Sequence, residues 1–202
     1  MHLLLATSNI AKLEEMRAIL FDPRITFHTP GDFTRLPPVN ETGRSYEENS
    51  AIKAISYAQR AGLWALADDS GLEVEALDHA PGVFSARYAG PGSSDNARIA
   101  FLLSQLKSSG STDRAARFVC VTALAELNGS LVKVASGSCQ GQIIETPRGA
   151  NGFGYDPIFV PSGFSQTFAE LPAEVKNAIS HRAKSLEAMN AFLKELLAGV
   201  HE

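Results

Sequence analysis

The chain has 202 residues, 45% of them hydrophobic, and a net charge of −4. This length fits one domain, or one domain with a lobe folded onto it, and the apolar content argues against disorder. The charge balance includes no run of lysine or arginine, which argues against a general nucleic-acid surface. The longest apolar stretches, residues 3–6 and 119–125, are too short to cross a membrane.

Two further features point to a cytoplasmic protein. The first residues lack both the basic start and the length of a signal peptide. Cys120 and Cys139 lie 19 positions apart, without the CxxC spacing of a metal site, and nothing requires an oxidising compartment. We expect Cys120 to be a small buried core residue.

The first half of the chain is interpreted as alternating strands and helices. Ser45 and Glu48 form a capping box at the start of one helix, and Gly62 ends it. The apolar run before Asp68-Asp69-Ser70-Gly71 predicts a strand that ends there in a turn. The predicted elements are strands at residues 2–6, 25–28, 63–67, 72–77 and 83–88, and helices at 12–21 and 45–61.

The second half adds a hairpin and two helices. Asn128-Gly129 between two apolar runs is a strong two-residue hairpin signal. Residues 149–156 are rich in glycine and predicted to be irregular. The predicted elements are strands at residues 115–126, 131–135 and 157–160, and helices at 96–106 and 182–198. A strand-helix opening followed by a hairpin predicts an α/β protein with a mixed sheet.

The most informative motif is the carboxylate pair Asp68-Asp69. Each carboxylate loses hydration at the end of a buried strand, and this loss is unfavourable unless a divalent cation or basic groups lie beside the carboxylate. A phosphate-cleaving site provides that environment. The competing interpretation is a simple β-turn, because Asp, Ser and Gly all favour turns.

A second candidate lies between the first strand and the first helix. Free backbone N–H groups and a helix dipole meet there, which favours anion binding. It is no Walker P-loop, and a plain connection capped by Ser8 or Asn9 is the alternative. The candidate residues are Thr7, Ser8, Asn9, Ile10, Ala11 and Lys12.

Three further groups carry candidate chemistry. Asn49 and Lys53 share a helix face, and Lys53 is either directed to a phosphate or an ordinary surface lysine. Phe153, between two glycines, has room to lie against a flat ligand, or belongs to a plain surface loop. His181 and Arg182 follow the capping residue Ser180, where cations oppose the helix dipole unless a ligand compensates or water solvates them.

In this order, the segments resemble the inosine triphosphate pyrophosphatase family, also called the Ham1-like family. The similarity spans nearly the whole chain. Ser8 stands where a glycine is frequent, and Tyr46 where phenylalanine is usual. The matching residues are Thr7-Ser8-Asn9, Lys12, Glu41-Thr42-Gly43, Glu48-Asn49, Lys53, residues 67–72, 81–88, 152–157 and 169–171, Lys176, and Ile179-Ser180-His181-Arg182.

The resemblance implies hydrolysis of a nucleoside triphosphate to its monophosphate and pyrophosphate, with Mg²⁺ required. The implied substrates are the deaminated purine nucleotides ITP, dITP and XTP. It also implies a homodimer whose subunit, residues 1–202, is one domain. That domain is expected to have an elongated mixed α/β sheet flanked by helices, and two lobes with a cleft between them.

We therefore assign roles by hypothesis. Asp69 is the general base for the attacking water, and Glu41, Asp68 and Asp69 hold Mg²⁺. Lys12 and Lys53 neutralise the departing pyrophosphate, and Phe153 stacks on the base. The remaining substrate contacts are assigned to Thr7, Ser8, Asn9, Ile10, Ala11, Ser70, Gly154 and Tyr155, and the base edge to Asp156, Lys176, His181 and Arg182.

Two other functions fit parts of the pattern. A Maf-like pyrophosphatase acting on pyrimidine or modified nucleotides could share the architecture. A non-catalytic nucleotide-binding regulator could share the nucleotide contacts, although it would not need the carboxylates.

Overall fold

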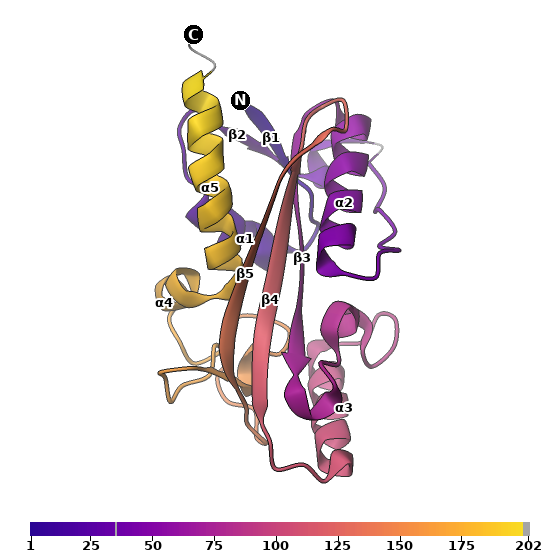
Figure 1. Ribbon diagram of the computed structural model, residues 1–202, viewed down its shortest axis with the longest axis vertical. Coiled ribbons are helices and arrows are strands. Elements are labelled where there is room, and N and C mark those ends of the chain that lie inside the picture. The colour runs from indigo at the N-terminus through magenta and orange to yellow at the C-terminus, as the bar shows by residue number, and fades with distance from the viewer. Residues whose placement is uncertain (35, 200–202) are drawn as a thin grey trace. The chain divides into compact units, whose positions relative to one another are not determined.

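The protein is described by a computed structural model that covers residues 1–34 and 36–199. Its centre is a six-stranded sheet in the order β2-β1-β3-β4-β5-β6 (Figure 1). The strand β1 pairs in parallel with β2 and β3, whereas β5 and β6 are antiparallel, so the predicted mixed α/β sheet is confirmed. The strands are β1 (His2–Leu5), β2 (Thr26–His28), β3 (Trp64–Val74), β4 (Ala115–Ala125), β5 (Leu131–Ile143) and β6 (Phe159–Pro161).

Five α-helices are described, and they lie between and after the strands in the chain. The α-helices are α1 (Ile10–Ile19), α2 (Tyr46–Ala61), α3 (Asp95–Ser109), α4 (Ala173–Ile179) and α5 (His181–Gly199). Four short 3₁₀ helices complete the described elements: η1 (Pro30–Asp32), η2 (Glu75–Leu77), η3 (Gly82–Arg87) and η4 (Asp156–Ile158).

The chain divides into two compact units. The first comprises residues 1–69, 120–137 and those from 182 on, and the second comprises residues 70–119 and 138–181. The strands β3, β4 and β5 contribute residues to both units. A single domain with a cleft between two lobes stays a prediction.

The first unit is built on the two-residue period of its strands. Leu3 and Leu5 of β1 pack with the apolar side chains of α1 and α5. Leu4 and Ala6 point to the other face and pack against Ala54, Tyr57 and Ala58 of α2. The helices α2 and α5 therefore cover opposite faces of this part of the sheet, as Figure 1 shows.

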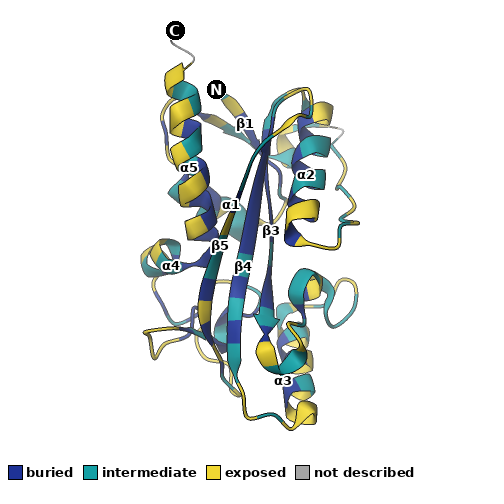
Figure 2. Ribbon diagram, in the orientation of Figure 1, coloured by how far each residue is buried: buried dark blue, intermediate teal, exposed yellow. Residues whose placement is uncertain are grey.

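The second unit has an aromatic core. The ring centroids of Phe118 and Phe159 lie 4.7 Å apart in an edge-to-face arrangement, and Phe168 contacts both rings. Three residues of α3, Ile99, Leu102 and Leu106, belong to the same buried cluster. Figure 2 shows the buried stripe of α3 beside its exposed face.

Several local predictions are confirmed. The Ser45 hydroxyl accepts a hydrogen bond from the backbone N–H of Glu48 at 3.1 Å, and Gly62 ends α2 with a left-handed φ of 63°. The other half of the predicted capping box differs, because the Glu48 carboxylate accepts from the Arg44 N–H.

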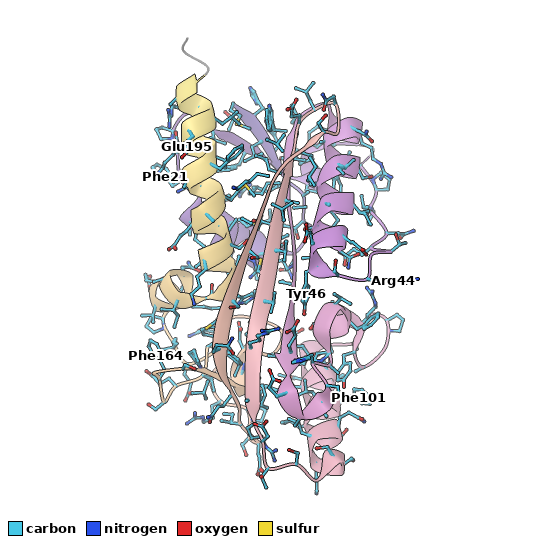
Figure 3. All side chains as sticks on the ribbon, viewed as in Figure 1. Phe21, Arg44, Tyr46, Phe101, Phe164 and Glu195 are labelled. Carbon is cyan, nitrogen blue, oxygen red and sulfur yellow. The ribbon has the colours of Figure 1, made fainter. Side chains whose placement is uncertain are left out.

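The predicted hairpin forms, but its loop has three residues, 127–129. The Glu126 N–H donates to the Ser130 carbonyl at 2.9 Å, and the Gly129 N–H donates to the Glu126 carbonyl at 2.8 Å. The first helix ends earlier than predicted, at Ile19, and Phe21 lies outside it with 78% of its surface exposed (Figure 3).

The predicted turn at Asp68-Asp69-Ser70-Gly71 is wrong, because β3 continues through these residues to Val74. The strand is paired on both sides, by β1 and β4, and this pairing overrides the local turn preference. The strand predicted at residues 72–77 is thus the end of β3 followed by η2.

The strand predicted at residues 83–88 is also wrong, since this segment is the 3₁₀ helix η3. The hydroxyl of Ser85 donates to the Gly82 carbonyl at 2.7 Å and accepts from the Leu72 N–H at 2.9 Å. These bonds favour a compact turn over an extended strand. The strand β5 extends eight residues beyond the predicted end at Ala135, and α4 was not predicted.

Both cysteines are buried and neither forms a disulfide, which confirms the core position of Cys120. Among the residues that the structure describes, no helix is long and apolar enough to cross a membrane.

Candidate active site

The first part of the site lies where β1 ends beside β3. The Ala6 N–H donates to the Leu66 carbonyl at 2.8 Å, so the chain leaves β1 next to the carboxylate pair. Asn9 then caps α1, because its side-chain oxygen accepts from the Lys12 N–H at 3.2 Å. Ligands of α/β sheets gather at this carboxyl edge of parallel strands. Of the two caps considered in the alternative interpretation, Ser8 and Asn9, the structure has Asn9. The helix begins two residues earlier than predicted, which places Lys12 in its first turn.

The two adjacent carboxylates point to opposite faces of β3. Asp68 follows the register of Leu66, which faces α1 and α5, and Asp69 follows that of Ala67, which faces α2. Their contacts agree: Asp68 binds side chains from α1 and α5, and Asp69 binds a side chain from α2.

Asp68 is the centre of a buried ionic network. Its Oδ2 lies 3.0 Å from Lys12 Nζ and 3.0 Å from Arg182 Nη2, and it also accepts from Arg182 Nε at 3.1 Å. Burial opposes ionisation of Asp68, but Lys12 and Arg182 together hold its pKa far below the usual value. Arg182 is itself buried and bonds through Nη1 to Glu15 of α1. The Asp68 Oδ1 is buried and has no hydrogen-bond partner among the described residues.

Asp69 is held by Asn49, a fully buried residue of α2. The Asn49 Nδ2 donates to Asp69 Oδ2 at 3.0 Å, while its Oδ1 accepts from the Gly43 N–H at 2.8 Å. The second bond fixes the orientation of the amide, so that its NH₂ group faces Asp69. Burial raises the pKa of Asp69, and nearby Lys53 opposes this shift.

Lys53 joins the loop before α2 to β3. Its Nζ lies 2.9 Å from Glu41 Oε1 and also donates to the Asp68 carbonyl. Burial alone would lower the pKa of Lys53, but Asp68 and Glu41 raise it. The surface interpretation of Lys53 is therefore wrong, since only 8% of the residue is exposed. Glu41, Lys53 and Asp69 share the α2 face.

The structure does not bring Glu41, Asp68 and Asp69 together as three ligands. Within residues 1–34 and 36–199, no three acidic, histidine or cysteine side chains are arranged to hold a metal ion. The cause is the strand geometry, which turns Asp68 away from the α2 face. The chemistry of the donors still fits Mg²⁺, which prefers carboxylate oxygens and keeps several waters. The unpartnered Asp68 Oδ1 is a further oxygen that could accept from such a water.

The second unit holds a cluster of its own around the predicted aromatic residue Phe153. Lys176 is buried, and its Nζ lies 2.5 Å from Asp156 Oδ2 and 4.8 Å from the centre of the Phe153 ring. The same Asp156 oxygen accepts from the Phe153 N–H at 2.9 Å. A side chain at Gly152 would place its Cβ 2.1 Å from this oxygen, so the loop needs glycine there. Asp156 thus organises the loop on which Phe153 is presented.

His181 and Arg182 are both buried, so the interpretation that water solvates them is wrong. They start α5 as predicted, but they belong to different units. The His181 ring stacks on Phe118 at 4.7 Å in the second unit, whereas Arg182 binds Asp68 in the first. The assignment of both residues to the base edge stays a prediction.

The remaining predicted residues occupy three segments. Thr7 and Ser8 lie in the loop before α1, and Ile10, the first residue of α1, is 72% exposed. Ser70 lies within β3, and the Tyr155 hydroxyl donates to the Ser85 carbonyl at 3.0 Å. Sequence reasoning missed Glu15, although its spacing of three from Lys12 places both on one face of α1.

Comparisons with known proteins establish the family of the chain. The model of the Ham1 family matches residues 3–192. The chain belongs to the Ham1 family. The predicted family is thereby confirmed.

Curated relatives and solved structures are similar over nearly the full length. A protein of Geobacter sulfurreducens named dITP/XTP pyrophosphatase is 48% identical, with 96% of each chain covered. One of Streptomyces avermitilis with the same name is 45% identical, covering 96% of this chain and 98% of the relative. The structure of a HAM1 protein from Coxiella burnetii has a TM-score of 0.89 at 45% identity, covering 96% of this chain and 99% of that one.

Proposed function

We propose that this protein hydrolyses dITP, ITP and XTP to the nucleoside monophosphate and pyrophosphate, with Mg²⁺. The observation that carries the proposal is the buried carboxylate pair of β3, with Asp68 neutralised by Lys12 and Arg182 and Asp69 held by Asn49. The names of the relatives, dITP/XTP pyrophosphatase, support the substrate class.

In the proposed reaction, water attacks the α-phosphorus and Asp69 takes its proton. The new bond joins the water oxygen to the α-phosphorus, and the bond from that phosphorus to the bridging oxygen of the β-phosphate breaks. The raised pKa of Asp69 suits a general base. Lys12 and Lys53 offset the charge that gathers on the departing pyrophosphate.

Glu41 and Asp69 would hold the Mg²⁺ ion, which supplies positive charge for the phosphate oxygens when bound. The two side chains share the α2 face, where Glu41 pairs with Lys53 and Asp69 with Asn49. Asp68, on the other face, positions Lys12.

We propose that Phe153 stacks on the purine and that Lys176, Asp156, His181 and Arg182 recognise its edge. Hypoxanthine and xanthine carry an acceptor oxygen at C6, where adenine carries an amino donor. A cationic donor therefore favours the deaminated bases, and an unpaired buried donor can reduce the use of ATP by about 10⁴-fold.

The test is pyrophosphate release from ITP, dITP, XTP, GTP, ATP and dUTP, with Mg²⁺ and with excess EDTA. We expect turnover of the first three nucleotides and its loss in EDTA. Preferred cleavage of dUTP would instead support a Maf-like enzyme. Binding of ITP without pyrophosphate release would support a regulator.

We also propose that the protein works in the cytoplasm as a homodimer. Light scattering of the purified chain measures its molar mass and so tests the dimer. A monomeric mass at assay concentration would contradict the dimer.

We expect Gly43→Ala to reduce kcat about tenfold. A Cβ at this position would lie 2.7 Å from Asn49 Oδ1 and 2.6 Å from Glu48 Cβ, so the amide that holds Asp69 must move. The control is Gly31→Ala, where the nearest atom to the new Cβ is 3.7 Å away. Equal ITP turnover by the two variants would contradict this role of Gly43.

A further inference from the structure

The start of α3 is bonded to the loop that carries Phe153. Asp95, in the first turn of α3, accepts a hydrogen bond from the Gly154 N–H through Oδ2 at 2.6 Å. Its other oxygen, Oδ1, pairs with Arg98 on the next turn of the helix. The carboxylate therefore connects a fixed helix end to the backbone between Phe153 and Tyr155.

Arg98 is in turn fixed from two further sides. Its Nη1 donates to the Ala86 carbonyl at 2.9 Å and to the Ser93 carbonyl at 2.6 Å. Because the Arg98 guanidinium group is bonded to η3 and to the loop before α3, it holds the Asp95 carboxylate in one orientation. The Gly154 bond is thus a charge-assisted bond to a preorganised acceptor.

The loop needs such a support because its backbone is unusual. Gly152 and Gly154 have φ values of 73° and 62°, which glycine adopts without strain, and glycine loses more conformational entropy than other residues when its backbone is ordered. Two hydrogen bonds tie residues 154 and 155 to groups outside the loop. The Gly154 N–H donates to Asp95, and the Tyr155 hydroxyl donates to the Ser85 carbonyl.

We propose that Asp95 is a positioning residue for purine binding, which fixes the Phe153 ring for stacking by holding the Gly154 N–H. This inference rests on the proposed function, because it assumes that Phe153 stacks on the base. Asp95 acts on the loop and not on the phosphate-binding groups of the first unit. Its loss should therefore weaken binding of the base and leave binding of the phosphates unchanged.

The experiment compares wild type with Asp95→Ala, using ITP as substrate and two inhibitors. IMP probes the base, and inorganic tripolyphosphate probes the phosphate-binding groups alone. We expect KM for ITP and Ki for IMP to rise about tenfold, the effect of losing one hydrogen bond to a charged group. The Ki for tripolyphosphate and kcat should stay within about twofold.

The matched control is Asp113→Ala. Asp113 is also in the second unit and accepts from a backbone N–H, that of Ala115 at 2.8 Å. Its own N–H donates to Ser111, so Asp113 is bonded to residues of its own segment and not to the loop. We expect wild-type KM for this variant. Hydrogen exchange gives a direct readout, because the Gly154 amide should exchange faster in Asp95→Ala and not in Asp113→Ala.

Asp95→Asn keeps an acceptor for Gly154 but loses the charge that pairs with Arg98, so KM should rise about threefold. This variant carries the test if Asp95→Ala fails to fold. An unchanged KM in both variants, or a parallel rise of the tripolyphosphate Ki, would overturn the inference. If wild type itself releases no pyrophosphate from ITP, the proposed function fails first, which is a distinguishable result.

Discussion

Replacement of Asp69 by asparagine should reduce kcat for ITP about a thousandfold without destabilising the fold. The loss follows from removal of the general base, whose usual contribution is about 10²–10⁴-fold. Asparagine has nearly the shape of aspartate, and its side-chain oxygen can still accept from Asn49 Nδ2. Pyrophosphate release under saturating ITP measures the effect.

The stability of this variant is as informative as its activity. Burial raises the pKa of Asp69, which means that the folded protein disfavours the charged form. A neutral side chain removes this penalty, so the free energy of unfolding should be unchanged or higher. Asp69→Ala provides an independent check. Turnover within tenfold of wild type in both variants would contradict the assignment of Asp69 as the base.

Replacement of Arg182 by methionine should lower the free energy of unfolding by about 3–5 kcal/mol. The guanidinium is buried and binds two carboxylates, those of Asp68 and Glu15. Without it, Asp68 keeps its ion pair with Lys12 but loses the one with Arg182, and its charge stays buried. Denaturant unfolding at pH 7 measures the loss.

The size of this effect should depend on pH. The pKa of Asp68 is depressed in the folded protein, below the ordinary 3.8 of the unfolded chain. The stability that its charge contributes is therefore fully present above pH 3.8 and is lost as the pH falls toward the folded pKa. The difference between wild type and Arg182→Met should accordingly be full at pH 7 and shrink below pH 3.8.

Arg148→Met is the control, because Arg148 is half-exposed and lies 3.5 Å from Glu170. We expect a loss below about 1 kcal/mol, the usual range for exposed pairs. The double variant Asp68→Asn/Arg182→Met should recover part of the loss by removing the uncompensated charge. An Arg182→Met variant as stable as Arg148→Met would contradict the buried network.

Local features were predictable where neighbouring residues decide them. The Ser45 cap of α2, the glycine at position 62 and the hairpin at Asn128-Gly129 depend on neighbouring residues, and each was found. The finer details differ, because Glu48 accepts from the Arg44 N–H and the hairpin loop has three residues, 127–129. The segments that identify the family are also contiguous runs of sequence, and so they could be recognised without coordinates.

Features that depend on distant partners were not predictable in the same way. Ser85 lies in η3, where its hydroxyl accepts from the N–H of Leu72, 13 residues away. The pattern of apolar residues at 83–88 does not indicate this distant hydrogen bond, and so it predicted a strand. Arg182 finds Asp68 across 114 residues, so its burial with a carboxylate could not follow from its helix position.

The amino-acid sequence by itself determined the family, most of the elements and the residue types of the site, because these depend on short motifs and on the spacing of apolar residues. Only the tertiary structure decided that Asp68-Asp69 lies inside a strand, and therefore that the two carboxylates face different helices. The reason is physical: pairing with β1 and β4 outweighs the turn preference of Asp, Ser and Gly, and an extended strand must turn successive side chains to opposite faces.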